Sequence, residues 1–335
     1  MTNRIVATCL AMSLVAAAAA EAQTESGIVQ TSDVTYRNGS ITLAALLLMP
    51  PAEQPVPAAV IIQGSGSSDR SNQWSRDIAD ALVCNGMAVL LTDKRGSGAS
   101  GGDWRVAGFT ELAVDALAGV DFLQGRPEID RRRIGLVGLS QGGWVAPLAA
   151  ARSAEVAFVV NVSGAAVSFA EQTLLEMANT ARQAGLSDLL VQEVTSLNAA
   201  ALRYLTTGDW EQYARLRSRL LATDAREIAA GFQASPDAPI WTFYRSVVAY
   251  DPVPYWVQLG QPVLAVYGAE DERDNVPVAE SARRLEYAFR TVNKNNYRIL
   301  VVRGVGHGIR DPQTHRLAAE FVDTLAAWLQ SYVRR

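Results

Sequence analysis

Strands and helices are predicted to alternate along most of this chain of 335 residues. Short runs of consecutive apolar residues are typical of strands buried on both faces, and between them apolar positions recur every three or four residues, as in amphipathic helices. This alternation predicts an α/β fold with a mostly parallel sheet covered by helices on both faces. The predicted strands of this part are 58–62, 87–92, 133–139, 158–161, 263–267 and 297–302, and the helices are 74–84, 110–124, 141–151, 278–289 and 313–332.

The start of the sheet has a different pattern. Two strand-like segments, 34–37 and 41–48, are joined at Asn38-Gly39, a dipeptide typical of a type I′ hairpin turn. The sheet is therefore expected to begin with an antiparallel pair. With the six later strands this makes an eight-stranded sheet.

One long segment interrupts the alternation. From 168 to 250 the pattern is helical throughout, with apolar positions spaced by three and four in 170–184, 189–205 and 210–221. We expect this segment to be a helical cap inserted after the sixth strand, between two parts of one core, 23–167 and 251–335.

The N-terminus has the pattern of a secretory signal peptide. Met1–Arg4 is a short basic region, residues 5–20 are apolar, and Ala20-Glu21-Ala22 is a cleavage site of the small-x-small type. The apolar run is short for a membrane span, which needs about 20 residues. We expect residues 1–22 to be removed and the mature protein to be periplasmic or secreted, without a membrane span.

Composition argues against several classes of partner. A net charge of −4 argues against nucleic acid binding, and two histidines with no C-x-x-C or H-E-x-x-H pattern argue against a metal site. Residues 96–101 match the dinucleotide pattern G-x-G-x-x-G, but the predicted chain continues as a loop where that motif requires a helix. We expect no cofactor.

The most informative motif lies at 138–142, which reads G-L-S-Q-G between a predicted strand and a predicted helix. A serine on such a sharp turn has strained backbone angles and needs very small residues two positions before and after it, here Gly138 and Gly142. The pattern predicts a nucleophile elbow with Ser140 as the nucleophile. The alternative is a glycine-rich turn that is only structural.

Three segments resemble the α/β-hydrolase superfamily. Residues 63–70 read Q-G-S-G-S-S-D-R and are similar to the oxyanion loop, 93–100 read D-K-R-G-S-G-A-S and resemble a D-x-R-G-x-G-x-S loop, and 129–144 match around the elbow. The likeness is to the serine hydrolases grouped around serine aminopeptidases, dienelactone-hydrolase-like proteins and acyl-peptidase-like esterases. It covers about 33–165 and 255–332 but not the helical segment between them.

The resemblance implies a Ser-acid-His order for a catalytic triad. His307 follows the last predicted strand in a glycine-rich loop, where this fold places its base, whereas His315 falls in the predicted closing helix. For the acid, relatives show G-x-x-D-x-x-V-P, but the loop here has two extra residues between Gly268 and Val276-Pro277. Asp271 is the first candidate, and Asp274 and Glu270 stay open as alternatives.

An oxyanion hole made of backbone N–H groups is also implied. One donor is expected to be the amide of Gln141, directly after the nucleophile, and the other the amide of Ser65 in the 63–70 loop. Gln63 stands where relatives have histidine.

The expected function is hydrolysis of small to medium carboxylic esters through an acyl-enzyme, without cofactor. A short peptide substrate cleaved by the same triad is the alternative, and an inactive binding protein on the same fold is a third possibility. Six apolar and aromatic residues of the predicted cap are expected either to pack on the sheet or to line an acyl pocket: Phe169, Leu174, Met177, Trp241, Phe243 and Tyr244.

Overall fold

The computed structural model describes residues 28–333. The predicted signal peptide, 1–22, lies outside the described residues. Within 28–333, no helix has both the length and the apolar character that a membrane crossing requires.

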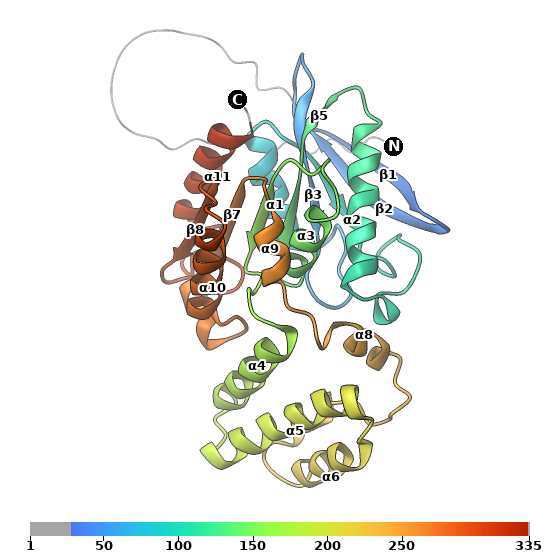
Figure 1. The fold of residues 1–335 in the computed structure, drawn as a ribbon, viewed down its shortest axis with the longest axis vertical. Coiled ribbons are helices and arrows are strands. Elements are labelled where there is room, and N and C mark those ends of the chain that lie inside the picture. The colour runs from blue at the N-terminus through green and yellow to red at the C-terminus, as the bar shows by residue number, and fades with distance from the viewer. Residues whose placement is uncertain (1–27, 334–335) are drawn as a thin grey trace.

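The centre of the molecule is an eight-stranded sheet in the order β1-β2-β4-β3-β5-β6-β7-β8 (Figure 1). β1 and β2 pair antiparallel with each other, β2 pairs antiparallel with β4, and all later pairs are parallel. The predicted α/β-hydrolase fold is thus confirmed. The strands are β1 Gln30–Asn38, β2 Ile41–Met49, β3 Val56–Ile62, β4 Ala88–Thr92, β5 Ile129–Leu139, β6 Val159–Val162, β7 Val263–Gly268 and β8 Tyr297–Val302.

The hairpin between β1 and β2 is present, but its turn differs from the predicted one. Asn38 pairs with Ile41, so the two loop residues are Gly39 and Ser40, one position later than expected. Gly39 has a φ of 56°, and Ser40 is not among the residues with positive φ. A positive φ at the first loop residue alone is typical of type II′, which accepts glycine there, whereas type I′ needs it at both.

Helices cover both faces of the sheet, as the side-chain alternation of β3 shows. Ala58, Val60 and Ile62 belong to one apolar cluster, which includes residues of α2, α3, α9 and α10. Ala59 and Ile61 belong to a second cluster with α1 and α11. These helices are α1 Gln73–Cys84, α2 Phe109–Gln124, α3 Gly142–Ala150, α9 Val253–Gln258, α10 Val278–Thr291 and α11 Ala319–Tyr332.

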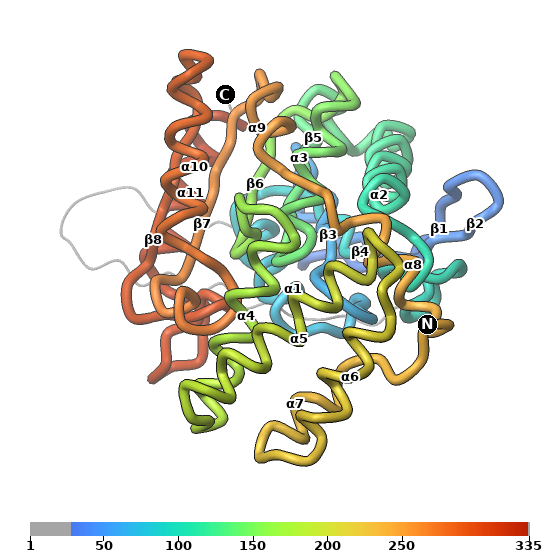
Figure 2. Tube along the Cα trace, turned by 60° about the horizontal axis from the view of Figure 1, so that its bottom comes forward, coloured from blue at the N-terminus to red at the C-terminus, as the bar shows by residue number. Residues whose placement is uncertain are grey.

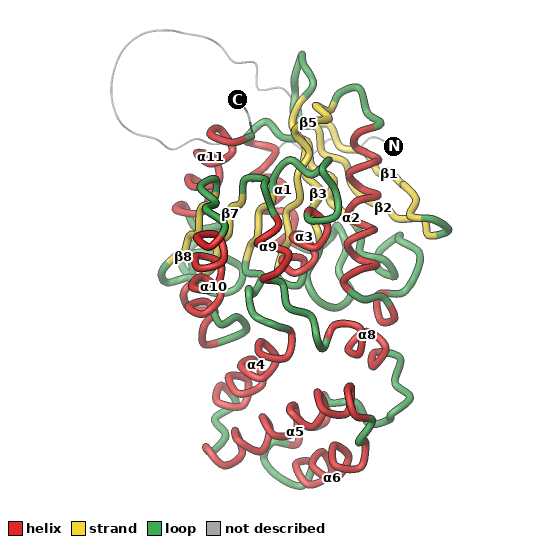
Figure 3. The backbone as a smooth tube through the Cα atoms, viewed as in Figure 1, coloured by secondary structure: helices red, strands yellow, loops and turns green. Residues whose placement is uncertain are grey.

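Six helices lie in the chain between β6 and β7, and the last of them, α9, packs on the sheet. The other five are α4 Phe169–Gln183, α5 Asp188–Thr207, α6 Trp210–Leu220, α7 Arg226–Gly231 and α8 Ile240–Val247. We call them the inserted helices. They have an apolar cluster of their own, in which Leu197, Tyr213 and Trp241 are buried. Figures 1 and 3 show them, without any strand, beyond the end of the sheet where β6 leads into α4. In Figure 2, where that end comes forward, they lie in front of the strands. This is the carboxyl end of the parallel strands.

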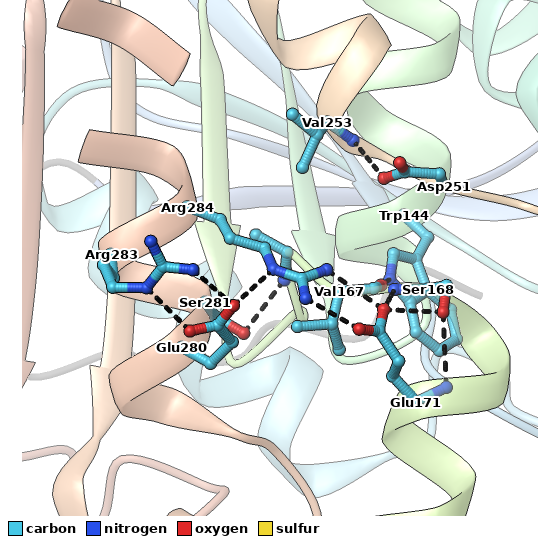
Figure 4. Close-up of polar contacts among 11 residues, drawn as sticks. Trp144, Val167, Ser168, Glu171, Asp251, Val253, Glu280, Ser281, Arg283 and Arg284 are labelled. Atoms are coloured by element: carbon cyan, nitrogen blue, oxygen red, sulfur yellow. Dashed lines mark hydrogen bonds and ion pairs between the residues drawn. The ribbon is translucent and has the colours of Figure 1, made fainter. Parts of the chain in front are cut away.

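Polar contacts connect α4 to the sheet region (Figure 4). Ser168 and Glu171 form a capping box at the start of α4. Arg284 of α10 donates to both carboxylate oxygens of Glu171, at 3.0 and 2.7 Å, and also pairs with Glu280. The Trp144 indole donates to the carbonyl of Val167 at 3.2 Å. The first turn of α4 is therefore held against α3 and α10.

The closing helix begins later than predicted. α11 starts at Ala319, and the segment before it forms a turn with a bridge between Arg310 and Leu317. The prediction that His315 belongs to this helix is wrong, because its φ of 56° is left-handed. Its backbone accepts from Arg310 at 2.7 Å, and the residue is exposed.

Candidate functional site

Ser140 lies on a strained turn between β5 and α3. Its φ is 51°, a value that non-glycine residues rarely adopt and that costs about 1–3 kcal/mol. A Cβ on Gly138 would overlap the carbonyl of Gly142, and one on Gly142 would overlap the carbonyl of Ile62. The chain can make this turn only because both positions are glycine. The turn presents Ser140 at the carboxyl end of the sheet.

His307 and Asp271 are in direct contact. His307 Nδ1 lies 2.7 Å from Asp271 Oδ2, and Asp271 is fully buried. The other carboxylate oxygen accepts the backbone N–H of Asn275 at 3.2 Å. With Nδ1 bonded to the carboxylate, Nε2 is the imidazole nitrogen that remains for a reacting group.

The acid loop, 269–276, folds so that only one of its carboxylates reaches His307. Its first residues form a short helix, η2 (Ala269–Arg273), inside which Asp271 is buried. Asp274 is exposed and lies beyond the turn, and Glu270 pairs with Arg273 at 3.4 Å. The structure thus places the first sequence candidate beside the imidazole and both alternatives away from it.

The inserted helix α4 binds the part of this loop that follows Asp271. Asn179 donates to the carbonyls of Glu272 and Asp274 at 3.1 and 3.4 Å, and Gln183 donates to that of Arg273 at 2.8 Å. The Glu270 N–H donates to the carbonyl of Val305, two residues before His307. The loop residues 272–274 therefore connect the Asp271–His307 pair to the inserted helices.

Two contacts of His307 had no recognisable signal in the sequence. Ser163, directly after β6, has a φ of 56° and donates its hydroxyl to the His307 carbonyl at 2.7 Å. The ring of Trp74, in the first turn of α1, lies 5.4 Å from the imidazole between centroids. Together they fix the backbone and one face of the histidine.

The loop after β3 lies against the nucleophile. A Cβ built on Gly64 would be 3.4 Å from Ser140 Cβ, which places the next residue, Ser65, beside the elbow. Gln63 is buried, donates to the Thr92 carbonyl at 2.9 Å and accepts from the Ser68 hydroxyl at 3.1 Å. The residue that departs from the pattern of relatives thus has a structural role in shaping the loop.

Lys94 is the residue near this loop that sequence reasoning missed. It occupies the variable position of the D-x-R-G segment, is buried, and donates to the Gly64 carbonyl at 2.7 Å and to Gln141 Oε1 at 2.5 Å. Its Nζ also lies 5.7 Å from the ring centroid of Trp104. Burial lowers the pKa of the Lys94 ammonium to about 7.

Three other charged residues of these loops are in ion pairs, whereas Asp69 accepts the backbone N–H of Ser71 at 2.7 Å. Arg70 pairs with the buried Asp93 at 2.7 Å, and Arg95 pairs with Asp115 at 2.6 Å. The loop that matches G-x-G-x-x-G runs on to the short helix η1 (Trp104–Val106) and to α2, so no helix begins within the motif. Across residues 28–333 no group of three or more His, Cys, Asp or Glu side chains could hold a metal ion.

A cavity of about 370 Å³ lies among the inserted helices. Four of the six cap residues named from the sequence line it, Phe169, Met177, Trp241 and Tyr244, whereas Leu174 and Phe243 do not. Phe243 packs instead on Phe109 of the sheet region.

The α4 end of the cavity lies near the elbow helix α3 and His307. Phe169 packs on Trp144 of the elbow helix, with ring centroids 5.9 Å apart. Glu176 also lines the cavity, and burial raises the pKa of its carboxyl, while the charge of His307 lowers it and those of Asp274 and Asp271 raise it. The Glu176 carboxyl in the cavity lining is thus close enough to His307 for the charges of these two side chains to interact.

Fold and site geometry together define an α/β-hydrolase. Residues 38–289 match the family model described as X-Pro dipeptidyl-peptidase (S15 family). The match covers more than half of the chain, so the protein belongs to the S15 family and is a hydrolase.

Individual relatives are more distant. The chain is 32% identical over 134 residues to the uncharacterized protein PA2218 of Pseudomonas aeruginosa, a match that spans 39% of this chain and 36% of that protein. The crystal structure of PA2218 superimposes with a TM-score of 0.58 at 21% identity, covering 91% of this chain and 94% of that one.

Two further solved structures share the fold. An esterase of Pyrococcus furiosus, Pf2001, has a TM-score of 0.61 at 17% identity and covers 91% of this chain and 92% of its own. The acylaminoacyl peptidase of Pyrococcus horikoshii has a TM-score of 0.57 at 15% identity, over 92% of this chain and 42% of that protein.

Proposed function

We propose that the protein is a serine hydrolase that cleaves small to medium carboxylic esters through an acyl-enzyme. The observation that carries the proposal is the 2.7 Å contact between His307 Nδ1 and the fully buried Asp271, together with the strained turn at Ser140. A buried carboxylate bonded to one imidazole nitrogen holds the other nitrogen in the form that accepts a proton.

The proposed reaction has two halves. Ser140 Oγ attacks the carbonyl carbon while His307 Nε2 takes its proton, and the alcohol leaves with that proton. Water then gives a proton to His307 Nε2 and its oxygen attacks the acyl carbon. The bond to Ser140 Oγ breaks, His307 returns the proton to Ser140 Oγ, and the acid leaves. Asp271 orients the imidazole throughout.

The negative oxygen of both tetrahedral intermediates needs preorganised donors. We assign this role to the backbone N–H groups of Gln141 and Ser65. The contact of Gly64 with Ser140 and the position of Gln141 directly after the nucleophile support this assignment.

A second candidate is a peptidase that uses the same residues. The S15 family model, described as X-Pro dipeptidyl-peptidase, favours this alternative. Amide cleavage needs the same nucleophile and oxyanion donors, with His307 protonating the leaving amine.

A side-by-side assay separates the two candidates. Purified protein is given p-nitrophenyl acyl esters and aminoacyl or dipeptidyl p-nitroanilides, including X-Pro substrates, at equal concentrations. The ester proposal expects higher kcat/KM on the esters and loss of that activity in Ser140→Ala. A higher kcat/KM on anilides would make the protein a peptidase, and no turnover of either would favour an inactive binding protein.

We also propose that the inserted helices act as a cap over the site and that the protein is exported after cleavage before Gln23. The basic and apolar pattern of residues 1–22 is the support for export. N-terminal sequencing of the protein recovered from the periplasm or the medium tests it, and a cytoplasmic protein that keeps Met1 would contradict it.

A further inference from the structure

Asn198, in the lining of the cavity among the inserted helices, has a buried N–H donor without an acceptor, and a turn of its amide would present this donor to the cavity. Asn198 of α5 lines the cavity and is 8% exposed, and its Nδ2 makes no hydrogen bond to any described residue. Among the described side chains with a buried unpartnered N or O atom, Asn198 is the one that lines this cavity. A buried donor without a partner destabilises the fold, so a ligand that supplies an acceptor would gain from meeting it.

The lining also limits the charge of a ligand. Most of it is apolar or aromatic, its ionisable side chains include the carboxylates of Glu176 and Glu227, and no Lys, Arg or His takes part. Neither glutamate forms an ion pair or side-chain hydrogen bond with a described residue. An anionic ligand would therefore meet uncompensated negative charge, whereas a neutral one would not.

The size of the cavity suits part of a small substrate. A cavity needs about 10–15 Å³ of this volume to hold one water molecule, so 370 Å³ is room for many. A medium-length acyl group fits this volume.

On the proposed function, we infer that this cavity binds the acyl part of the substrate and that Asn198 selects neutral acyl groups with a hydrogen-bond acceptor, such as an ether or carbonyl oxygen, along the chain. Asn198 is a specificity-determining residue in this account. It contacts the acyl chain away from the bond that is cleaved.

The test compares p-nitrophenyl octanoate with a series in which an ether oxygen replaces one methylene at successive positions. Wild-type protein is expected to prefer one member of the series over octanoate by about three- to tenfold in kcat/KM, the effect of one added hydrogen bond. Asn198→Leu, of similar volume, should abolish that preference and favour octanoate. Gln192→Leu, on the exposed face of the same helix, should keep the wild-type ratio.

Each outcome separates this inference from the proposed function. If wild-type protein hydrolyses p-nitrophenyl acetate and Asn198→Leu keeps the wild-type ratio, the inference fails while the esterase proposal stands. A preference for chains with an added hydroxyl or amide N–H over the ethers would also overturn it, because it would require an acceptor in the cavity. If no ester is hydrolysed, the proposed function itself fails.

A separate observation concerns Lys94, which joins the two segments that would hold the oxyanion. Its Nζ donates to the carbonyl of Gly64, directly before Ser65, and to the side chain of Gln141. No carboxylate forms an ion pair with Lys94 among the described residues. The ammonium group is therefore a buried charge whose hydrogen bonds all go to neutral oxygens of these two segments.

We propose that Lys94 is a positioning residue that holds the Ser65 and Gln141 amides in place for the oxyanion. By fixing Gly64 and Gln141 at once, it sets the separation of the two N–H donors. Its positive charge also favours the negative tetrahedral intermediate over the neutral ester.

The test is a pH profile of kcat and KM for p-nitrophenyl acetate. Lys94→Met should lower kcat about 10- to 100-fold with little change in KM, because the effect is on the transition state. Relative to Lys94→Met, wild-type kcat/KM should fall as pH rises through about 7, where Lys94 loses its proton.

Lys94→Arg provides the matched control, since it keeps a donor and a charge that does not titrate in this range. It should recover part of the lost kcat and also lack the fall near pH 7. If folded Lys94→Met keeps the wild-type kcat and pH profile, the proposal is overturned. If Lys94→Met and Lys94→Arg lose the same share of kcat and both keep the wild-type pH profile, the role of Lys94 is structural only.

Discussion

The sheet region and the inserted helices differ in how closely their sequences are tied to their geometry. In the sheet region, Gly138 and Gly142 are required by backbone contacts, and Asp271 and His307 meet at 2.7 Å. The cavity among the inserted helices needs only apolar side chains of suitable size, apart from a few polar residues such as Asn198. On the proposed function, the first region carries out the reaction and the second selects the substrate, so changes in each should affect different kinetic quantities.

The largest effect is expected from Ser140→Ala. Removing the nucleophile should lower kcat for ester hydrolysis by about 10⁵- to 10⁶-fold without unfolding the protein. Circular dichroism and stopped assays with p-nitrophenyl butyrate check both parts. Retention of more than a hundredth of the wild-type kcat by a folded variant would move the chemistry away from Ser140.

The next effect separates the two acid candidates. Asp271→Asn should lower kcat by about 10⁴-fold, because the amide favours the wrong tautomer of His307. Asp274→Asn, in the same loop but exposed, should stay within about twofold of wild type. The reverse ranking in steady-state assays would assign the acid to Asp274.

The inserted helices should control chain length. Across p-nitrophenyl esters from acetate to palmitate, kcat/KM should rise by up to about fourfold per methylene, from about 0.8 kcal/mol each, and then fall once the cavity is full. Leu202→Trp, which fills part of the lining, should move the maximum to shorter chains. A maximum at palmitate with a rate jump above the solubility limit would contradict control of chain length by this cavity.

The smallest effect should arise where the two regions meet. Asn179→Leu removes the donors to the Glu272 and Asp274 carbonyls and should lower kcat about three- to tenfold, because the Asp271 loop loses support from α4. Gln172, on the same helix, makes no hydrogen bond to this loop, so Gln172→Leu is the control. Equal kcat values for the two variants would show that α4 does not position the acid.

The order of strands and helices could be predicted because buried strands and amphipathic helices have distinct periods. The hairpin turn was displaced by one residue, since Gly39 can start a type II′ turn as readily as it can end a type I′ turn. The predicted helical start before His315 was wrong because the Arg310–Leu317 bridge, a contact between residues seven positions apart, determines that segment. Local patterns do not contain such contacts.

For the site, the sequence indicated residues that need a special backbone or a fixed chain order, such as Ser140 and His307. It did not indicate Lys94, Ser163 or Asn198. Lys94 and Ser163 make contacts between distant segments, for example the hydrogen bond between Lys94 and Gln141, which are 47 residues apart. Asn198 stands out only through its burial beside the cavity. A lysine or an asparagine in a loop or helix is usually exposed, so its burial becomes visible only in three dimensions.

The most direct test of the central claim, that Ser140 is an activated nucleophile, is covalent labelling with a fluorophosphonate followed by peptide mapping. The account predicts one modified residue, Ser140, with labelling strongly slowed in Asp271→Asn and at the normal rate in Asp274→Asn. Modification of another serine while Ser140 stays free, or no modification of a folded protein that hydrolyses esters, would contradict it.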